Sequence, residues 1–165
     1  MAKKKPIVTN AMRHLQAAKV EFEAIEYECD DEIGQDFGMQ IAEKTGIEPE
    51  RSFKTLVARG DKTGVLVSCI PVNCEIDLKK LAQASGDKKV ELIHVKELLG
   101  LTGYIRGGVT PIGMKKKYPT FIDECCLDFE KIAISAGICG CTLLIKPQDV
   151  IKECSAKTVD IRKED

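Results

Sequence analysis

The chain has 165 residues, of which 44% are hydrophobic and 31% charged, and its formal net charge is −1. This length and composition are typical of one soluble globular domain with a single sizeable core. A charge so close to zero excludes wholesale wrapping of nucleic acid, so we expect no DNA partner, although short basic clusters would allow contact with part of an RNA. No apolar run approaches the length of a membrane span, and the start lacks the apolar core of a secretory signal. We therefore expect a cytoplasmic protein without membrane contact.

Eight cysteines raise the question of a metal site or a disulfide framework. None belongs to a Cys-x-x-Cys pair or a Cys-His cluster, and the pairs Cys125-Cys126 and Cys139-x-Cys141 do not match a structural zinc site. Without a secretory signal, the thiols are expected to be reduced and to serve mostly as small core residues. The sequence thus predicts no metal and no cofactor.

The two ends of the chain are predicted to lie outside the folded domain. Residues 1–8 are interpreted as a disordered basic start and residues 162–165 as a charged tail, which leaves one domain over residues 9–161. That domain opens with Thr9, a residue suited to capping a helix from Asn10 to about Lys19.

The next segment alternates between apolar and polar residues from Val20 to Cys29, with a change of phase near Ala24. The alternation predicts a strand, and the change of phase predicts a bulge or a kink within it. An acidic loop over residues 30–37 and a short helix over residues 38–45 are predicted to follow.

Two apolar runs, Ser52–Ala58 and Val65–Ile70, flank a turn sequence of five residues and predict a hairpin. Lys54 lies in the first run. A lysine within an apolar strand needs a partner, an edge position or a pocket that keeps its ammonium hydrated. An outward-facing lysine on an edge strand is the alternative interpretation.

The second half of the chain is predicted to contain short helices and strands in irregular order. These are a helix capped by Asp77 over residues 78–85, a strand over 90–93, a helical turn over 95–99 stopped by Gly100, strands over 119–123, 131–135 and 138–145, a helix over 147–154 and a strand over 158–161. Short strands mixed irregularly with short helices indicate one α+β domain with a mixed, strongly curved sheet.

The segment from Tyr104 to Lys117 is unusual, because Gly107 to Gly113 contains three glycines and a proline in seven residues. Such a run cannot continue a helix or a central strand. It predicts a rigid loop with exposed amides of the kind that hold a carbonyl, a phosphate or a ribose. Arg106 and Lys115–Lys117 flank this glycine loop with positive charge. A tight surface connection with solvated lysines is the alternative, and the loop becomes a site only if another part of the chain points at it.

Several segments together resemble one protein family. They are Phe53-Lys54-Thr55-Leu56, Ile76-Asp77-Leu78-Lys79-Lys80-Leu81-Ala82, the glycine loop after Tyr104, and Pro119-Thr120-Phe121-Ile122-Asp123. In this order they resemble the YbaK/EbsC family, free-standing relatives of the editing domain inserted in bacterial prolyl-tRNA synthetase. The match runs from about Ala11 to Ile161. The resemblance implies a single α+β domain with a mixed, barrel-like sheet flanked by short helices. It also implies hydrolysis of misacylated tRNA, with cysteinyl-tRNA(Pro) as the best-known substrate of the YbaK branch.

The resemblance also assigns expected roles to residues of this chain. Lys54 matches the family's essential lysine and is the expected catalytic residue. The expected substrate-binding residues are Tyr27, Phe37, Thr55, Gly107, Gly108, Thr110, Pro111, Gly113 and Ser135. Local positive charge adds expected RNA contacts at Arg106, Lys79, Lys80, Lys115, Lys116 and Lys117. The chain departs from the family pattern at Ile138, Cys139, Cys141 and Thr142, so one pocket wall is expected to be more apolar than usual.

The expected reaction needs little machinery, because an aminoacyl ester is already activated and the chain offers no obvious Ser-His-Asp set. The resemblance implies that the substrate's own thiol attacks its carbonyl. Lys54 would set the terminal ribose or phosphate, and amides near Gly107 and Gly108 would hold the carbonyl oxygen. Hydroxyls of Tyr27, Thr55 and Ser135 would orient the ribose or the amino group.

Aminoacyl-tRNA is the expected partner, with prolyl-tRNA synthetase as a further one. Two alternatives remain open. One is a deacylase for another aminoacyl-tRNA, such as an alanyl species, and the other is a non-catalytic module that binds tRNA or a synthetase. A thiol-dependent redox or metal protein is a more distant interpretation.

Overall fold

The computed structural model describes residues 7–29 and 37–164 of the chain. Most of the predicted basic start, most of the predicted acidic loop and the last residue of the predicted tail lie outside this part. Among the described residues, no helix is both long enough and apolar enough to cross a membrane.

Short helices and strands alternate irregularly along the chain, as predicted. The α-helices are α1 (Asn10–Ala17), α2 (Phe37–Thr45), α3 (Leu78–Ser85), α4 (Leu98–Thr102) and α5 (Pro147–Cys154). The strands are β1 (Glu23–Glu26), β2 (Phe53–Gly60), β3 (Gly64–Pro71), β4 (Val90–Leu92), β5 (Thr120–Asp123), β6 (Ile132–Ser135), β7 (Cys141–Ile145) and β8 (Lys157–Val159). Short 3-10 helices are η1 (Pro49–Arg51), η2 (Val95–Glu97) and η3 (Glu124–Asp128).

Local chemistry explains where these helices begin and end. The Thr9 hydroxyl accepts a hydrogen bond from the N–H of Met12 at 3.1 Å, so α1 begins where the predicted cap places it. The Asp77 carboxylate caps α3 through two amides of its first turn. Gly100 does not stop α4, contrary to the prediction. The helix ends at Gly103, because a left-handed conformation with φ of 86° is first reached there.

The prediction of a long strand from Val20 to Cys29 with a bulge is wrong. β1 covers Glu23–Glu26 alone and pairs with β7 in an uninterrupted antiparallel register. Val20 and Phe22 precede the strand and pack against the core. Their apolar character therefore reflects packing of the segment that leads into β1 and not a bulge within it.

The predicted hairpin of β2 and β3 is confirmed, but its turn is shorter than expected. Gly60 pairs with Gly64, so the connection has three residues instead of five. The side chains of β3 from Leu66 to its end are buried, whereas those of Lys54, Thr55 and Leu56 in β2 are only partly buried. This long hairpin forms the centre of the larger sheet.

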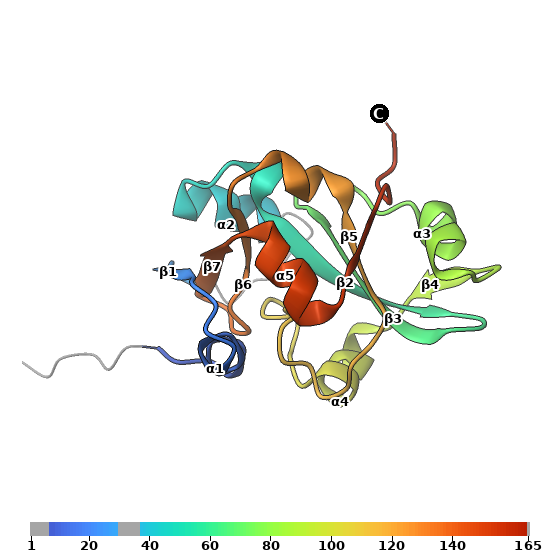
Figure 1. Ribbon diagram of the computed structural model, residues 1–165, viewed down its shortest axis with the longest axis horizontal. Coiled ribbons are helices and arrows are strands. Elements are labelled where there is room, and N and C mark those ends of the chain that lie inside the picture. The colour runs from blue at the N-terminus through green and yellow to red at the C-terminus, as the bar shows by residue number, and fades with distance from the viewer. Residues whose placement is uncertain (1–6, 30–36, 165) are drawn as a thin grey trace, which may run out of the picture.

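The strands form two sheets that are linked near the start of β2. The smaller has the order β1-β7-β6 and is antiparallel. The larger has the order β4-β2-β3-β5-β8, in which β3 and β8 run parallel to β5. A bridge between Ser52 and Ala133 connects the two sheets. In Figure 1 the small sheet and α2 lie at one end of the molecule, and α3 and β4 lie at the other. The α+β class is confirmed, with one antiparallel sheet and one mixed sheet in place of a single mixed, curved sheet.

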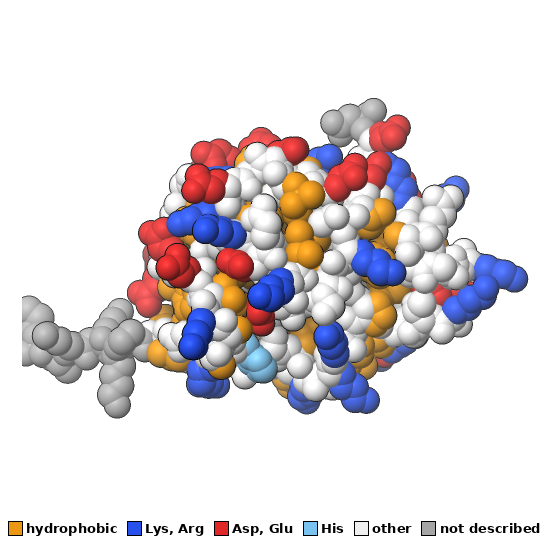
Figure 2. All heavy atoms as spheres, viewed as in Figure 1, with side chains coloured by type: hydrophobic (Ala, Val, Ile, Leu, Met, Phe, Trp, Pro, Cys, Tyr) orange, Lys and Arg blue, Asp and Glu red, His pale blue; other side chains and the backbone are white. Residues whose placement is uncertain are grey.

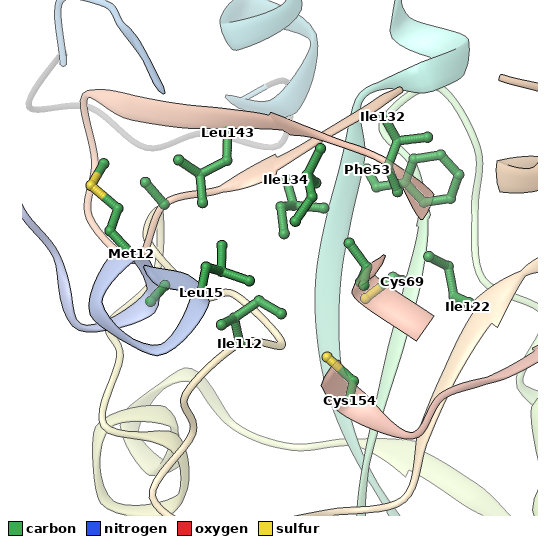
Figure 3. Packing of buried hydrophobic residues seen from close by; sticks show 14 of the residues in the cluster. Met12, Leu15, Phe53, Cys69, Ile112, Ile122, Ile132, Ile134, Leu143 and Cys154 are labelled. Carbon is green, nitrogen blue, oxygen red and sulfur yellow. The ribbon is translucent and has the colours of Figure 1, made fainter. Parts of the chain in front are cut away.

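Two clusters of buried side chains form the core. The larger joins α1, both strands β6 and β7 and the start of β2, and Figure 3 shows Leu15, Ile134 and Phe53 among its members. The smaller packs α3 against the far end of the larger sheet through residues such as Leu81 and Leu66. The larger cluster contains residues of both sheets and therefore packs the two sheets against each other.

Most cysteines behave as predicted, but one pair does not. Four are buried core residues, namely Cys69, Cys126, Cys141 and Cys154. Cys29 and Cys139 form a disulfide with Cα atoms 5.7 Å apart, so the prediction of reduced thiols is wrong for this pair. The two residues are 110 positions apart in the sequence, and the pairing of β1 with β7 brings them together.

Candidate functional site

A cavity of about 470 Å³ is lined by both sheets and by the connections around them. Its walls come from the end of β1, α2, β2, the segment from β4 to α4, the glycine loop, β6 and β7. The volume falls within the range of roughly 300–1,000 Å³ that small-molecule sites occupy. Elements that are distant in the sequence therefore converge on one space large enough for a ligand.

Lys54 lines this cavity from β2, so it is not an outward-facing lysine on an edge strand. Within the described part of the chain, its ammonium forms no ion pair. Burial lowers the pKa of Lys54, and the nearby groups of Cys74 and Glu75 oppose this effect. A half-buried ammonium without a carboxylate partner is suited to binding an anionic group of a ligand.

The two predicted aromatic residues, Tyr27 and Phe37, both line the cavity. Tyr27 follows β1, and its N–H donates to the carbonyl oxygen of Gly140 at 2.9 Å, which extends the pairing of β1 with β7. Burial raises the pKa of the Tyr27 phenol, so its hydroxyl is protonated and can donate to a ligand. Phe37 begins α2, and Ile41 on the same helix also faces the cavity.

The predicted hydroxyl residues Thr55 and Ser135 line the same cavity from β2 and β6. Thr55 Oγ1 lies 3.7 Å from the Sγ atom of the buried Cys69, which fixes the position of its hydroxyl. Ser135 Oγ accepts a hydrogen bond from the N–H of Gly137 at 3.1 Å. Because the hydroxyl of Ser135 is the acceptor there, its hydrogen can still be donated to a ligand.

The stretch that departs from the family pattern contributes only partly to the cavity. Cys141 and Thr142 line it, whereas in the described structure Ile138 and Cys139 do not. The Thr142 hydroxyl donates to a carbonyl oxygen of β6 at 2.7 Å, so its hydrogen is not available to a ligand. Burial raises the pKa of the Cys141 thiol, which is therefore neutral. With Ala133 also facing the cavity, this wall is small and largely apolar.

The first half of the glycine loop meets the cavity. Gly107 and Val109 line it, and Gly107 has a φ of 92° that only glycine adopts easily. Gly108 is buried, and its N–H donates to the carbonyl oxygen of Ile105 at 2.9 Å. The Gly108 amide is thus bonded within the turn and is not the donor expected to hold a substrate carbonyl. Gly107 is the member of the expected pair that faces the cavity.

The second half of the loop anchors it to the rest of the fold. Within the described residues, Thr110, Pro111 and Gly113 do not line the cavity, although all three were expected to bind substrate. Thr110 and Pro111 are buried. The Asn10 side-chain amide donates to the carbonyl oxygen of Gly113 at 2.8 Å and to the Tyr104 hydroxyl at 3.1 Å. These contacts tie the loop to α1 and give it the rigidity that its sequence predicts.

Sequence reasoning missed an apolar part of the cavity. Its members come from β4, η2, α4 and the connection between β4 and η2, and they are Leu92, Ile93, Val95 and Leu98. Two of them are strongly exposed, with 46% of Leu92 and 55% of Val95 accessible to solvent. Their sequence shows only a short strand and a helical turn, so no local signal marks them. Arg106, predicted as an RNA contact, also lines the cavity.

The lysines predicted to contact RNA lie outside the cavity lining. Lys79 and Lys115–Lys117 are exposed to solvent. Lys80 is held by the fold, because its ammonium lies 3.0 Å from the Asp160 carboxylate and 2.8 Å from the carbonyl oxygen of Arg162. On the face that Figure 2 shows, lysine and arginine side chains occur in separate groups.

The cavity combines one ammonium, several hydroxyls, a glycine turn and an apolar surface. The described residues contain no group of three or more His, Cys, Asp or Glu side chains placed to hold a metal ion. Such a set can bind a ligand with a polar or anionic end and an apolar end and hold it in one orientation. The fold and the site therefore define an α+β domain with a cavity suited to binding a small ligand, or the end of a larger one, in one orientation.

The chain belongs to the aminoacyl-tRNA editing domain family, whose model matches residues 39–153. The matched range contains Lys54, the whole glycine loop and Ser135. The resemblance to the YbaK/EbsC family that the sequence motifs indicate is thus confirmed.

Curated relatives and solved structures agree with this membership. The chain is 45% identical over 163 residues to EbsC of Enterococcus faecalis, a candidate Cys-tRNA(Pro)/Cys-tRNA(Cys) deacylase, with 98% of each chain covered. It is 24% identical over 127 residues to the multifunctional Ser/Thr-tRNA deacylase ProXp-y of Escherichia coli, covering 74% of this chain and 76% of the relative. A crystal structure of a candidate trans-editing enzyme for prolyl-tRNA synthetase superposes with a TM-score of 0.81 at 21% identity, covering 96% of this chain and 100% of that one. The last similarity supports the fold alone.

Proposed function

We propose that this protein is an aminoacyl-tRNA deacylase that hydrolyses the ester of misacylated tRNA, with cysteinyl-tRNA(Pro) as its main substrate and cysteinyl-tRNA(Cys) as a second. The observation that supports this most is that Lys54 and Gly107 line one cavity together with Tyr27, Thr55 and Ser135. These residues come from four separate parts of an editing-family chain. The candidate activity of EbsC, which is similar over nearly the whole length, supports the choice of cysteinyl substrates.

The chemical character of the cavity fits the aminoacylated end of a tRNA. The ammonium of Lys54, which lines the cavity, can bind a terminal phosphate or ribose oxygen and stabilise negative charge that develops on the carbonyl oxygen. Hydroxyls of Thr55 and Ser135 can donate to the ribose or accept from the substrate amino group. The small apolar wall at Ala133 and Cys141 suits a small side chain such as that of cysteine.

The apolar part of the cavity gives the terminal base a place to bind. Leu92, Val95 and Leu98 present aliphatic surface, and a nucleic-acid base buries its apolar face against such surface. Arg106 on the same lining can contact the adjoining phosphate. The arrangement therefore offers separate places for the amino acid, the ribose and the base of one aminoacylated nucleotide.

The proposed reaction uses the substrate's own thiol. The cysteinyl sulfur attacks the ester carbonyl, a C–S bond forms, and the C–O bond to the ribose breaks. The proton of the thiol passes to the ribose oxygen, which leaves free tRNA and a cyclic thioester that water then hydrolyses. Lys54 stabilises the tetrahedral oxyanion in this scheme, and removing an oriented donor of this kind typically costs ~100-fold or more in rate.

A panel of charged tRNAs tests the proposal. Purified protein is incubated with tRNA(Pro) carrying cysteine, alanine, serine or threonine, and ester hydrolysis is followed over time. We expect cysteinyl-tRNA(Pro) to be turned over fastest and seryl-tRNA(Pro), which has oxygen in place of sulfur, to be slow. Fastest turnover of seryl or threonyl species would instead favour the activity named for the 24% identical relative. Slower hydrolysis than in buffer alone would indicate a module that only binds and protects charged tRNA.

Variants at Lys54 separate catalysis from binding. Lys54→Ala is expected to lower the rate on cysteinyl-tRNA(Pro) by ~100-fold, whereas Lys54→Arg keeps the charge and is expected to lose less. Equal rates for wild type and Lys54→Ala would remove Lys54 from the mechanism. A folding control by circular dichroism accompanies both variants.

Two further parts of the proposal concern partners and place of action. A chain with a net charge of −1 and scattered basic groups is expected to bind tRNA weakly by itself. We propose that prolyl-tRNA synthetase supplies additional affinity and that the protein acts in the cytoplasm, where tRNA is charged. Co-sedimentation of the purified protein with prolyl-tRNA synthetase, with and without tRNA(Pro), tests the partnership. Absence of co-sedimentation in both conditions would contradict it.

A further inference from the structure

The Cys29–Cys139 disulfide joins two segments that form the wall of the cavity. Cys29 lies two residues after Tyr27, and Cys139 lies two residues before Cys141. Tyr27 and Cys141 both line the cavity, although neither half of the disulfide does so in the described structure. The bond therefore links the two strands of this wall just beyond the end of their β pairing.

The same bond lies close to the glycine loop. Ile138 precedes Cys139, and a Cβ atom built on Gly108 would lie 2.8 Å from the Cα atom of Ile138. Gly107, the neighbour of Gly108, lines the cavity. Three cavity segments thus meet where the disulfide forms, namely the end of β1, the turn between β6 and β7, and the glycine loop.

We propose that Cys29 and Cys139 form a reversible redox-modification site that sets the affinity of the cavity for its substrate. In the oxidised form the bond holds Tyr27 and Cys141 in the arrangement seen here. In the reduced form this wall keeps weaker contacts, such as the hydrogen bond from the Tyr27 N–H to Gly140 and that from the Lys44 ammonium to the Glu28 carbonyl oxygen at 2.8 Å. The part of the proposal that concerns the substrate rests on the proposed function.

Accessibility and pairing together distinguish these two cysteines, because Cys74 and Cys125 are also partly exposed but are free thiols in the described structure. Cys29 is exposed and Cys139 is partly exposed, so a small oxidant or reductant can reach their sulfur atoms. Cys69, Cys126 and Cys154 are buried in the core and cannot be reached without unfolding. The antiparallel pairing of β1 with β7 also brings the two residues to the same end of the small sheet.

The chemistry is ordinary thiol–disulfide exchange with a low-molecular-weight disulfide as the oxidant. The Cys29 thiolate attacks one sulfur of the oxidant, whose S–S bond breaks and releases one thiolate. The Cys139 thiolate then attacks the mixed disulfide at Cys29 and displaces the second thiolate. Two electrons pass from the protein to the oxidant, and the two protons lost by Cys29 and Cys139 are taken up by the released thiolates. A dithiol reverses the reaction by the same steps.

The expected effect is on substrate affinity more than on the chemical step. A wall that is already held in place loses less conformational freedom on binding, which improves affinity without new contacts. Because Lys54 is on β2, which the disulfide does not join, we expect its position relative to the reacting ester to be unchanged once substrate is bound. We expect KM to rise about threefold to tenfold on reduction, with kcat changing less than about twofold.

The first test compares the oxidised and reduced protein in the absence of substrate. Full-length protein is equilibrated in glutathione buffers of graded ratio, its thiols are alkylated, and the disulfide is mapped by mass spectrometry. Hydrogen exchange is then measured on the oxidised and reduced forms at the amides of Tyr27 and Ala136, which bond to Gly140 and Cys141. We expect slower exchange at both amides in the oxidised form. A different pairing, no bond in any buffer, or equal exchange in both forms would overturn the proposal.

Kinetics on cysteinyl-tRNA(Pro) provide the second readout. The Cys29→Ser and Cys139→Ser variants should reproduce the KM of reduced wild type in both buffers, whereas Cys74→Ser, a change at a partly exposed cysteine outside the pair, should still respond to the redox buffer. An equal KM for oxidised and reduced wild type would refute the effect on affinity. If no redox state hydrolyses any charged tRNA, the proposed function fails, and the exchange measurement alone decides whether the disulfide controls the wall.

Discussion

Gly108 packs directly against the backbone of Ile138, because a Cβ atom added to Gly108 would lie 2.8 Å from the Ile138 Cα and 3.0 Å from its carbonyl carbon. This contact joins the glycine loop to the turn between β6 and β7. Gly107 of the loop and Cys141, which follows the turn at the start of β7, both line the cavity. The glycine is therefore required for close approach of two backbones, and not for a peptide donor aimed at the ligand.

Gly108→Ala is expected to destabilise the protein by roughly 1–3 kcal/mol, because backbone atoms on both sides must move apart. Urea denaturation of the variant and wild type measures the change. Gly100→Ala is the matched control, since a Cβ there meets no atom within 4 Å and Gly100 lies in α4. That control should be neutral or more stable by up to about 1 kcal/mol. Equal stability of Gly108→Ala and wild type would contradict the packing argument.

Lys54→Met is expected to raise the melting temperature at neutral pH by a few degrees, while it removes deacylase activity. Burial lowers the folded-state pKa of Lys54, so the charged form is penalised in the folded state. As pH rises from the folded pKa towards the unfolded one, the unfolded chain holds more protons and wild type gains stability. The difference in melting temperature between Lys54→Met and wild type should therefore become smaller at alkaline pH. Lys88→Met, which changes an exposed lysine, is the control. A melting temperature for Lys54→Met below that of wild type at pH 7 would contradict the prediction.

Asp87→Asn is expected to lower the melting temperature by several degrees at pH 7 and by less in acid. The Asp87 carboxylate accepts hydrogen bonds from the N–H groups of Lys62 and Thr63 and from the hydroxyls of Thr63 and Ser85, at 2.6–2.8 Å. These bonds hold the pKa of Asp87 well below its usual range. The stabilisation is present above the unfolded carboxyl pKa near 4 and is lost as pH falls through the lower folded value. Melting curves recorded from pH 7 to pH 2 test this pH dependence, with Asp128→Asn as a control at an exposed carboxylate. If the melting temperatures of Asp87→Asn and wild type differed by the same amount at every pH, the ionisation of Asp87 would not contribute to stability.

Alkylation of the folded, reduced protein is expected to distinguish core thiols from accessible ones. Burial raises the pKa of Cys69 to about 12 and that of Cys126 to about 11, and both residues are almost inaccessible. Cys74 is partly exposed. At pH 8, iodoacetamide should modify Cys74 at least about tenfold faster than Cys69 or Cys126, as read by mass spectrometry of peptides. Labelling in urea should remove the difference, and similar rates in the folded protein would show that the core opens readily.

Replacement of Lys115–Lys117 by alanine is expected to weaken tRNA binding and its dependence on salt. Each lysine that contacts a phosphate of single-stranded RNA contributes about 0.7 to the slope of log K against log salt concentration, so the slope should fall by up to about 2. The slope is measured by filter binding of tRNA at salt concentrations from about 50 to about 200 mM. The control changes three lysines outside the cavity, Lys19, Lys146 and Lys152, which leaves the same net charge. Equal slopes for the two triple variants would mean that Lys115–Lys117 is only a solvated surface.

Local signals in the sequence predicted most of the helices and strands and two parts of the candidate site, the glycine loop and Lys54. Thr9 and Asp77 cap helices because their side chains bond to amides within the next few residues. The glycine loop follows from its own composition, because three glycines and a proline cannot continue a helix or a central strand. Lys54 is noticeable in the sequence because a charged side chain within an apolar strand needs a partner or contact with water. In the structure this side chain lines the cavity.

Only the tertiary structure decided what surrounds these residues. The apolar lining at Leu92 and Val95, the Cys29–Cys139 bond and the contact of Gly108 with Ile138 join positions that are distant along the chain. Hydrogen-bond caps and turn preferences act over a few residues, so a sequence displays them directly. A cavity wall or a disulfide depends on how whole strands pair and pack, and no short stretch of residues records that pairing.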